Sequence, residues 1–223
     1  MRILIINPNS TASMTSSIAE AAEKIAAPGT VITATNPADG PASIQGPQDG
    51  DDAWPGLLRV FEDRLAPGHP YDAVIIACFD DTGLLDLKSR TSIPVLGIGE
   101  AAFHAAMMLG GKFSVVTTLA VSVPVIEDNI ERYGFSDRCA KVRASGVPVL
   151  DLEDEGSKAE TTIRNEAKVA IQEDQCDVVV LGCAGMADLA ASMTQAFNLP
   201  VIDGVAAAVG FCEGLVRMGI SNE

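Results

Sequence analysis

The sequence predicts an α/β fold with two pseudo-symmetric lobes, each built around a mainly parallel four-stranded sheet flanked by helices. Two local patterns and one internal repeat lead to this prediction. Short runs rich in Val and Ile alternate with Ala-rich stretches of helical period, which is typical of strand-helix units that feed a parallel sheet. The runs are almost continuously apolar, as expected when helices cover both faces of a sheet.

The internal repeat indicates the two lobes. Segment 71–78, YDAVIIAC, aligns without gaps on segment 176–183, CDVVVLGC, at an offset of 105 residues. Segment 93–96 matches 199–202 at an offset of 106, and segment 2–7 resembles 112–117 at an offset of 110. We therefore expect a first lobe of residues 1–97 plus 205–223, which contains Cys78. The second lobe then consists of residues 98–204 and contains Cys183.

The individual elements follow from the local pattern. The expected strands are 2–6, 31–35, 73–77, 93–97, 113–117, 141–145, 178–182 and 200–202. The expected helices are 11–26, 53–65, 82–90, 100–109, 122–133, 157–174, 186–197 and 205–218. Asn9, Ser10 and Thr11 are suitable caps for the first helix. Residues 36–50, which are rich in Pro and Gly, are expected to form a long loop.

Composition argues against several classes of function. The chain has 15 basic and 30 acidic residues and a net charge of −15, so nucleic acid is not an expected partner. No apolar run approaches the roughly 18 to 20 residues of a membrane-spanning helix, so no membrane partner is expected. The first apolar run stops at Asn7, too soon for a signal peptide, which favours a cytoplasmic protein. Five cysteines without CxxC or Cys/His clusters favour neither a disulfide framework nor a metal site.

Four residues at the ends of expected strands suggest a reaction. Cys78, Cys183, Asn7 and Thr117 each lie at the carboxyl end of a strand, where open α/β sheets bind ligands, and they converge if the lobes face each other. Inverting a carbon centre by deprotonation requires a base on one face and an acid on the other, with the roles exchanged in the reverse direction. Two cysteines at matched positions meet this requirement. We therefore predict a cofactor-independent racemase with Cys78 and Cys183 as the catalytic pair.

The turn and helix expected after each cysteine would place its thiol near a helix N-terminus. Such a position can lower a thiol pKa towards neutrality, and the backbone N–H groups could stabilise an enolate oxygen. A single cysteine at a strand end more often only fills space, but a matched pair favours catalysis. The other cysteines lack this symmetry, since they are expected in a turn, before a strand and on the apolar face of the last helix: Cys139, Cys176 and Cys212.

Neighbouring polar residues are further candidates for substrate binding. Asn7 suits either a turn or a ligand contact, and the hydroxyl groups of Thr117 and Thr118 could bind a polar substrate. Asp80 is a candidate for contact with the substrate. Asp80 and Asp81 are also suited to capping the helix that follows them.

Six segments in order along the chain carry a family resemblance. They are INPNS at 6–10, GPASIQG at 40–46, ACFDDTGL at 77–84, IPVLGIGEAA at 93–102, KFSVVTT at 112–118 and LGCAGM at 181–186. Together they are similar to the hydantoin and allantoin racemases of the aspartate/glutamate racemase superfamily. The resemblance implies two flavodoxin-like lobes with the active site between them, an acid/base pair of Cys78 and Cys183, and no metal or organic cofactor.

Departures from the superfamily pattern favour a particular substrate class. Its amino-acid racemases typically read CNT and GCT at the two cysteines, where this chain has CFD at 78–80 and GCA at 182–184. The changes remove carboxylate-binding groups and add an anion, which favours an uncharged cyclic ureide such as a hydantoin or allantoin. The candidate substrate-binding residues beside the thiols are Phe79, Asp80, Ala184 and Gly185. Gln45 stands where relatives commonly have Glu, which leaves the role of the 36–50 loop open.

Other functions stay open at this point. An amino-acid racemase or a maleate isomerase of the same superfamily would need anion-binding groups that the two motifs do not obviously supply. An arylmalonate decarboxylase needs one proton-donating cysteine, so the second thiol counts against it. A bilobal protein could also bind a small molecule without turning it over. A homo-oligomer is plausible.

Overall fold

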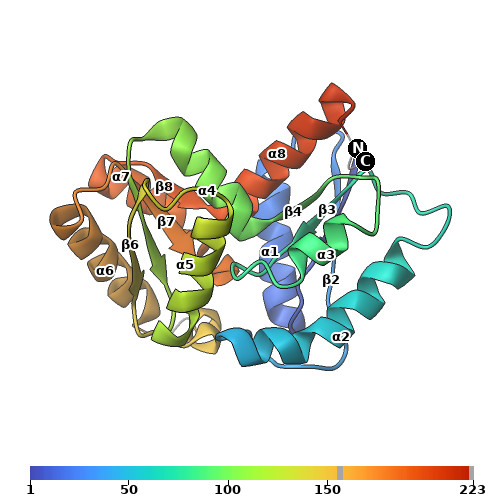
Figure 1. Ribbon diagram of the computed structural model, residues 1–223, viewed down its shortest axis with the longest axis horizontal. Helices are drawn as coiled ribbons and strands as arrows, with labels where there is room; N and C mark the ends of the chain where they lie inside the picture. The colour runs from blue at the N-terminus through green and yellow to red at the C-terminus, as the bar shows by residue number, and fades with distance from the viewer. Residues whose placement is uncertain (155–157, 221–223) are drawn as a thin grey trace.

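The computed structural model describes residues 1–154 and 158–220, which form two four-stranded sheets with parallel pairing throughout. The strand orders are β2-β1-β3-β4 and β6-β5-β7-β8, so the two sheets have the same topology. Figure 1 shows them as two lobes beside each other. The predicted α/β fold with two similar lobes is confirmed.

The first sheet contains the first four strands of the chain: β1 (Arg2–Ile6), β2 (Val31–Thr35), β3 (Ala73–Ile76) and β4 (Val95–Gly97). The helices around it are α1 (Ala12–Ile25), α2 (Pro47–Arg64), α3 (Leu84–Lys88) and α8 (Gly204–Met218). The two central strands, β1 and β3, are buried along nearly their whole length. Helices on both faces explain why these strands are continuous apolar runs.

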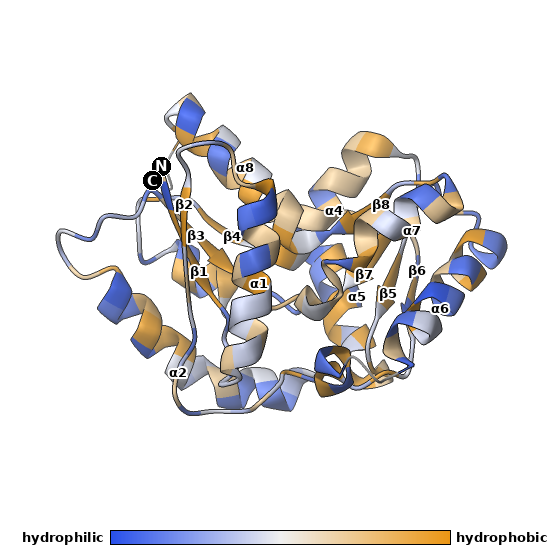
Figure 2. Cartoon of the chain, turned by 180° about the vertical axis from the view of Figure 1, so that it is seen from behind, coloured by the Kyte–Doolittle hydropathy of each residue, from blue (hydrophilic) through white to orange (hydrophobic). Residues whose placement is uncertain are grey.

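The second sheet contains β5 (Phe113–Thr117), β6 (Cys139–Ala144), β7 (Val178–Gly182) and β8 (Val201–Asp203). Its helices are α4 (Ile98–Leu109), α5 (Val123–Arg132), α6 (Ala159–Glu173) and α7 (Leu189–Phe197). Three short 3-10 helices complete the lobe: η1 (Ala120–Ser122), η2 (Val149–Glu153) and η3 (Ala184–Met186). Figure 2 shows apolar strands inside each lobe, with hydrophilic residues along the outer faces of α2 and α6.

The last helix returns to the first lobe. After β8, α8 packs against α4, α1, β3 and β4, and its Cys212 is completely buried. Conversely, α4 follows β4 of the first sheet but packs against β7 of the second sheet. We propose on these contacts that the described residues of 1–97 and 205–223 form the first lobe and the described residues of 98–204 the second.

Several predicted boundaries were wrong for identifiable reasons. Helix α2 begins at Pro47, inside the expected loop, because proline suits the first turn of a helix. The expected helix 82–90 starts only at Leu84, after Asp81 and Gly83 take left-handed backbone conformations with φ of 50° and 68°. Cys139 begins β6 and does not lie in a turn. The expected start of helix 157–174 lies outside the described residues, and α6 is seen from Ala159.

Candidate active site

The strand register brings the carboxyl ends of the central strands together. Ile6 pairs with Ile76 in the first sheet, and Thr117 pairs with Gly182 in the second. The residues that follow these pairs therefore meet between the lobes, where they line one cavity. The predicted residues on its wall are Asn7, Cys78, Phe79, Asp80, Thr117, Thr118, Cys183 and Ala184. Gly185 does not line the cavity.

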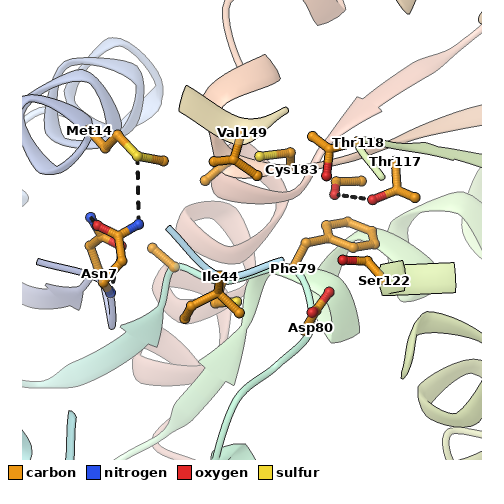
Figure 3. Close-up of a pocket in the computed structure, with 15 residues that line it drawn as sticks. Asn7, Met14, Ile44, Phe79, Asp80, Thr117, Thr118, Ser122, Val149 and Cys183 are labelled. Carbon is orange, nitrogen blue, oxygen red and sulfur yellow. Dashed lines mark hydrogen bonds between the residues drawn. The ribbon is translucent and has the colours of Figure 1, made fainter. Parts of the chain in front are cut away.

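The cavity is small and partly open. The space open to the centre of a water molecule is about 30 Å³, whereas one water needs about 10–15 Å³ on this measure. Figure 3 shows Asp80 and Ser122 at one end and Met14 and Asn7 at the other. A five-membered ring with a substituent therefore requires the walls to move before it can bind.

Cys78 follows β3 and contacts donors from its own loop. The Thr82 hydroxyl donates to its Sγ at 3.5 Å, and the backbone N–H of Asp80 also faces the sulfur. These donors favour the thiolate, but burial and then the nearby Asp80 carboxyl outweigh them and raise the pKa of the thiol. Because α3 starts only at Leu84, the expected lowering of this pKa by a helix N-terminus is wrong.

Cys183 occupies the matched position after β7, at the start of η3. The backbone N–H of Gly185 faces its sulfur, in the same relation as Asp80 has to Cys78. Burial is the largest effect and raises the pKa of Cys183 to about 12, with a smaller contribution from the charge of Asp80. One turn of 3-10 helix does not offset this burial, so the predicted lowering is wrong here as well.

Asp80 lies close enough to both thiols for its charge to act on each. Its Oδ2 is buried without a hydrogen-bond partner among the described residues. Burial raises the pKa of this carboxyl to about 7, although the backbone N–H of Gly46 partly opposes the shift. A buried carboxylate oxygen without a partner is costly in a folded protein, so a ligand group is its natural partner here.

Asp81 does not cap the helix that follows it, as the sequence had suggested. Its carboxylate accepts hydrogen bonds from the N–H groups of Gly99 at 3.0 Å and Glu100 at 2.7 Å, at the start of α4. The Tyr133 hydroxyl donates to Asp81 Oδ2 at 2.8 Å. The residue next to Asp80 is thus bound to groups of the second lobe.

Asn7 and Thr117 hold the cavity walls together. The Asn7 amide donates to Asn9 Oδ1 at 2.9 Å and to Thr15 Oγ1 at 3.0 Å. The Thr117 hydroxyl donates to the Gly182 carbonyl at 3.0 Å and joins the ends of β5 and β7. The donor groups of both side chains are therefore already used, whereas Thr118 lines the cavity without this tie.

Seven residues of the cavity wall were not among the predicted site residues. They are Asn9, Met14, Ile44, Ala77, Ser122, Val149 and Gly182. Met14 lies on α1 and Ile44 in the Pro- and Gly-rich segment, where no local pattern distinguishes a site residue from a packing residue. Ser122 lies five residues after Thr117 at the end of η1, a spacing that could have marked it as a polar neighbour of the strand end.

Residues 41–46, which we term the strap, contribute Ile44 to the cavity wall and contact both lobes. The strap is bound to the first lobe because the Ser10 N–H donates to the Pro41 carbonyl and the Thr11 hydroxyl to the Ala42 carbonyl. It reaches the second lobe through Gln45, whose Oε1 accepts from the Val149 N–H at 3.1 Å. The hydroxyl groups expected to cap α1 thus hold the strap.

Within residues 1–154 and 158–220, no group of three or more His, Cys, Asp or Glu side chains is placed to hold a metal ion. Over the same residues no helix is long and apolar enough to cross a membrane.

Comparisons with known proteins agree with this geometry. A model of the Asp/Glu/Hydantoin racemase family matches residues 3–212. A hydantoin racemase of Rhizobium meliloti is 45% identical over 222 residues, which cover 100% of this chain and 91% of the relative.

Two solved structures are similar to this chain over its whole length. An allantoin racemase from Klebsiella pneumoniae superposes with a TM-score of 0.96 at 41% identity and covers 100% of this chain and 90% of its own. The allantoin racemase from Pseudomonas fluorescens gives a TM-score of 0.92 at 43% identity, with coverages of 100% and 94%. From the family match and these relatives, the chain belongs to the Asp/Glu/Hydantoin racemase family.

Proposed function

We propose that this protein racemises 5-substituted hydantoins or allantoin, using Cys78 and Cys183 to move a proton at C5 without a metal or organic cofactor. One observation carries the proposal. The two thiols come from matched strand ends of two similar lobes and line the same cavity. This arrangement provides the two acid/base groups that inversion requires.

The reaction balances with these two groups alone. The thiolate of one cysteine removes the C5 proton, and the electron pair of the C–H bond moves into the adjacent carbonyl to give an enolate. The thiol of the other cysteine donates its proton to the opposite face of C5. The first cysteine ends as a thiol and the second as a thiolate, ready for the reverse direction.

The chain supplies hydrogen-bond donors for whichever cysteine is charged. Burial favours the neutral thiol at both positions, so each thiolate depends on groups that face its sulfur. Those groups are the N–H of Asp80 with the Thr82 hydroxyl at Cys78, and the N–H of Gly185 at Cys183. Gly185 thus acts on the catalytic sulfur and does not form part of the cavity wall.

The substrate class follows from Asp80. Its unpartnered Oδ2 can accept a hydrogen bond from a ring N–H of a hydantoin or allantoin, both of which are uncharged cyclic ureides. A dicarboxylate or an amino-acid carboxylate would instead meet this acidic group at close range. Thr118 and Ser122 supply further polar groups on the same wall, and Met14, Ile44 and Val149 supply apolar ones.

The proposal is tested with pure protein and a panel of single enantiomers. The panel contains several 5-alkyl hydantoins, allantoin, aspartate and glutamate, and loss of optical rotation is followed. We expect at least one cyclic ureide to racemise faster than either amino acid. The activity should survive EDTA and extensive dialysis, and iodoacetamide should abolish it.

Two outcomes contradict the proposal. Faster turnover of aspartate or glutamate than of every ureide would reject the substrate class. An absolute requirement for added metal or pyridoxal phosphate would reject the mechanism. If the protein only binds ureides, the bound ureide will retain its C5 proton in deuterated water. This result separates a binding protein from an enzyme.

A further inference from the structure

The loop that carries Cys78 is bound to a helix of the opposite lobe. Asn129 of α5 donates from Nδ2 to the carbonyl of Asp80 at 2.8 Å, and Tyr133, which follows α5, donates to Asp81 Oδ2 at 2.8 Å. Asn129 is buried, and Tyr133 also packs against Phe103. Both bonds cross from the second lobe to the first.

These bonds lie between two spaces. On one side of the loop is the small cavity between the thiols, to which Asp80 contributes. On the other side is an open cleft of about 420 Å³, lined among others by Asp80, Thr82, Trp54, Asn129 and Arg132. The loop from Cys78 to Thr82 is therefore a thin wall, and it is the second lobe that holds this wall from behind.

The segment after the second thiol is attached to the opposite lobe differently. Helix α1 is the counterpart of α5, since each follows the first strand of its sheet's central pair, and α1 packs against η3 after Cys183. That contact is apolar, because Ile18 and Ala22 of α1 and Ala184 belong to one buried hydrophobic cluster. The polar contact from α1 is an exposed ion pair between Lys24 and Asp188, beyond η3, at 2.7 Å. The two matched packings thus differ in chemistry, because hydrogen bonds reach the residues next to the thiol only on the Cys78 side.

We propose that Asn129 and Tyr133 are positioning residues that fix the Cys78 loop and so place the Cys78 thiol and the Asp80 carboxyl against the substrate. The proposal rests on the proposed function. It explains why Asp81 has a left-handed backbone conformation. In this conformation its carboxylate accepts hydrogen bonds from the start of α4 and from Tyr133 together. It also predicts that these hydrogen bonds control the position of the Cys78 thiol and leave the position of the Cys183 thiol unaffected.

The test compares Tyr133→Phe and Asn129→Ala with the unaltered protein. The matched control is Tyr71→Phe, which removes the hydroxyl of the other tyrosine of the chain, outside the cavity and the cleft. Alkylation of each cysteine by iodoacetamide is followed by peptide mass spectrometry, and kcat and KM are measured on the best ureide of the panel.

We expect each variant to lower kcat about tenfold, because a displaced acid/base group loses most of its advantage. The ratio of the Cys78 to the Cys183 alkylation rate should rise at least about threefold, since only the Cys78 loop is released. Tyr71→Phe should change neither quantity. Each variant tests the proposal independently, so a folding defect in one leaves the other decisive.

A general loss of stability gives a different result, because it would speed alkylation of both thiols alike and leave their ratio unchanged. An unchanged ratio in both variants therefore overturns the inference, as does a change confined to Cys183. If the unaltered protein racemises no ureide, the proposed function fails, yet the alkylation ratio still tests whether α5 holds the loop.

Discussion

The position of Asp80 differs in two ways from that of an ordinary surface carboxylate. It lies close to both thiols, and one of its oxygens is buried without a partner. An ionised Asp can only accept a hydrogen bond, whereas an Asn or Thr side chain can also donate one to a substrate carboxylate. A single residue can thus reverse the polarity of the substrate that the cavity accepts.

Stability should therefore depend on pH through this residue. The pKa values of Asp80 and Asp81 are both raised to about 7 in the folded protein, mainly by burial. The folded state then binds these protons more tightly than the unfolded state, so the free energy of unfolding falls as pH rises from about 4 to about 7. Asp80→Asn should make this fall shallower, by at most a few kcal/mol across the range.

The measurement is chemical denaturation of both proteins between pH 4.5 and 8. Asp63→Asn, at an exposed position of α2, is the control and should leave the slope unchanged. An Asp80→Asn variant with the full pH dependence of the unaltered protein would contradict the assigned burial of this charge.

At the scale of residues, the sequence predicted the thiol pair because a repeat marks equivalent positions without any knowledge of packing. It also predicted most of the cavity wall, since strand ends of parallel sheets meet at one edge. It did not predict the partners of Asp81, because Gly99, Glu100 and Tyr133 reach it only after two lobes pack. Met14 and Ile44 were missed for the same reason.

Among the elements, the strap bridges the two lobes beside the cavity. The resemblance left Gln45 unexplained, and the structure shows that its Oε1 accepts the Val149 N–H of the second lobe while its own N–H donates to Asp49. A Glu at this position would keep an acceptor oxygen. The charge found in relatives is therefore not required for this contact.

Gln45→Ala should weaken the closed position of the strap. The loss of one hydrogen bond between lobes should raise KM about fivefold and leave kcat within about twofold, since the thiols are untouched. Gln45→Glu should behave like the unaltered protein. Gln48→Ala is the matched control, because Gln48 is a nearby glutamine that is exposed on α2. Steady-state kinetics on one ureide decide the matter, and an unchanged KM in Gln45→Ala would exclude a role for the strap in substrate binding.

Element boundaries failed where backbone conformation depends on single residues. Strands and long helices were predicted well because their apolar pattern repeats over many positions. The start of α2 was missed because Pro47, Gly50 and Pro55 read as loop residues, although Pro47 is favourable in a first turn and Pro55 lies within the helix. The short α3 was overestimated because left-handed Asp81 and Gly83 delay its start.

For the whole molecule, the proposed mechanism assigns one enantiomer to each lobe, since each lobe carries one of the two thiols. In that mechanism each cysteine faces one side of C5 and removes the proton of one enantiomer only. Cys78→Ser and Cys183→Ser should each lower net racemisation at least about a hundredfold, because inversion needs both groups.

Isotope exchange distinguishes the two variants. A surviving thiolate can remove the C5 proton of its own enantiomer and return a deuteron from solvent on the same side. Exchange in deuterated water, followed by NMR on each enantiomer, should therefore show opposite preferences in Cys78→Ser and Cys183→Ser. Cys139→Ala should keep turnover within about threefold, since Cys139 begins an outer strand away from the cavity. Substantial racemisation by both serine variants is incompatible with a paired mechanism.

The return of α8 to the first lobe also affects how the chain is made. On the ribosome, β1 to β4 emerge early, yet the helix that packs against β3 and β4 is translated only after the strands of both sheets. Val205, Ala208, Val209 and Cys212 share one buried cluster with Ile3 and Ile75, so that side of the nascent sheet stays uncovered until α8 has been made. The second lobe, whose α4 is translated before its strands, can fold earlier. The chain should therefore complete its first-made lobe last, and a ribosome stalled before Gly204 should present an apolar sheet to chaperones.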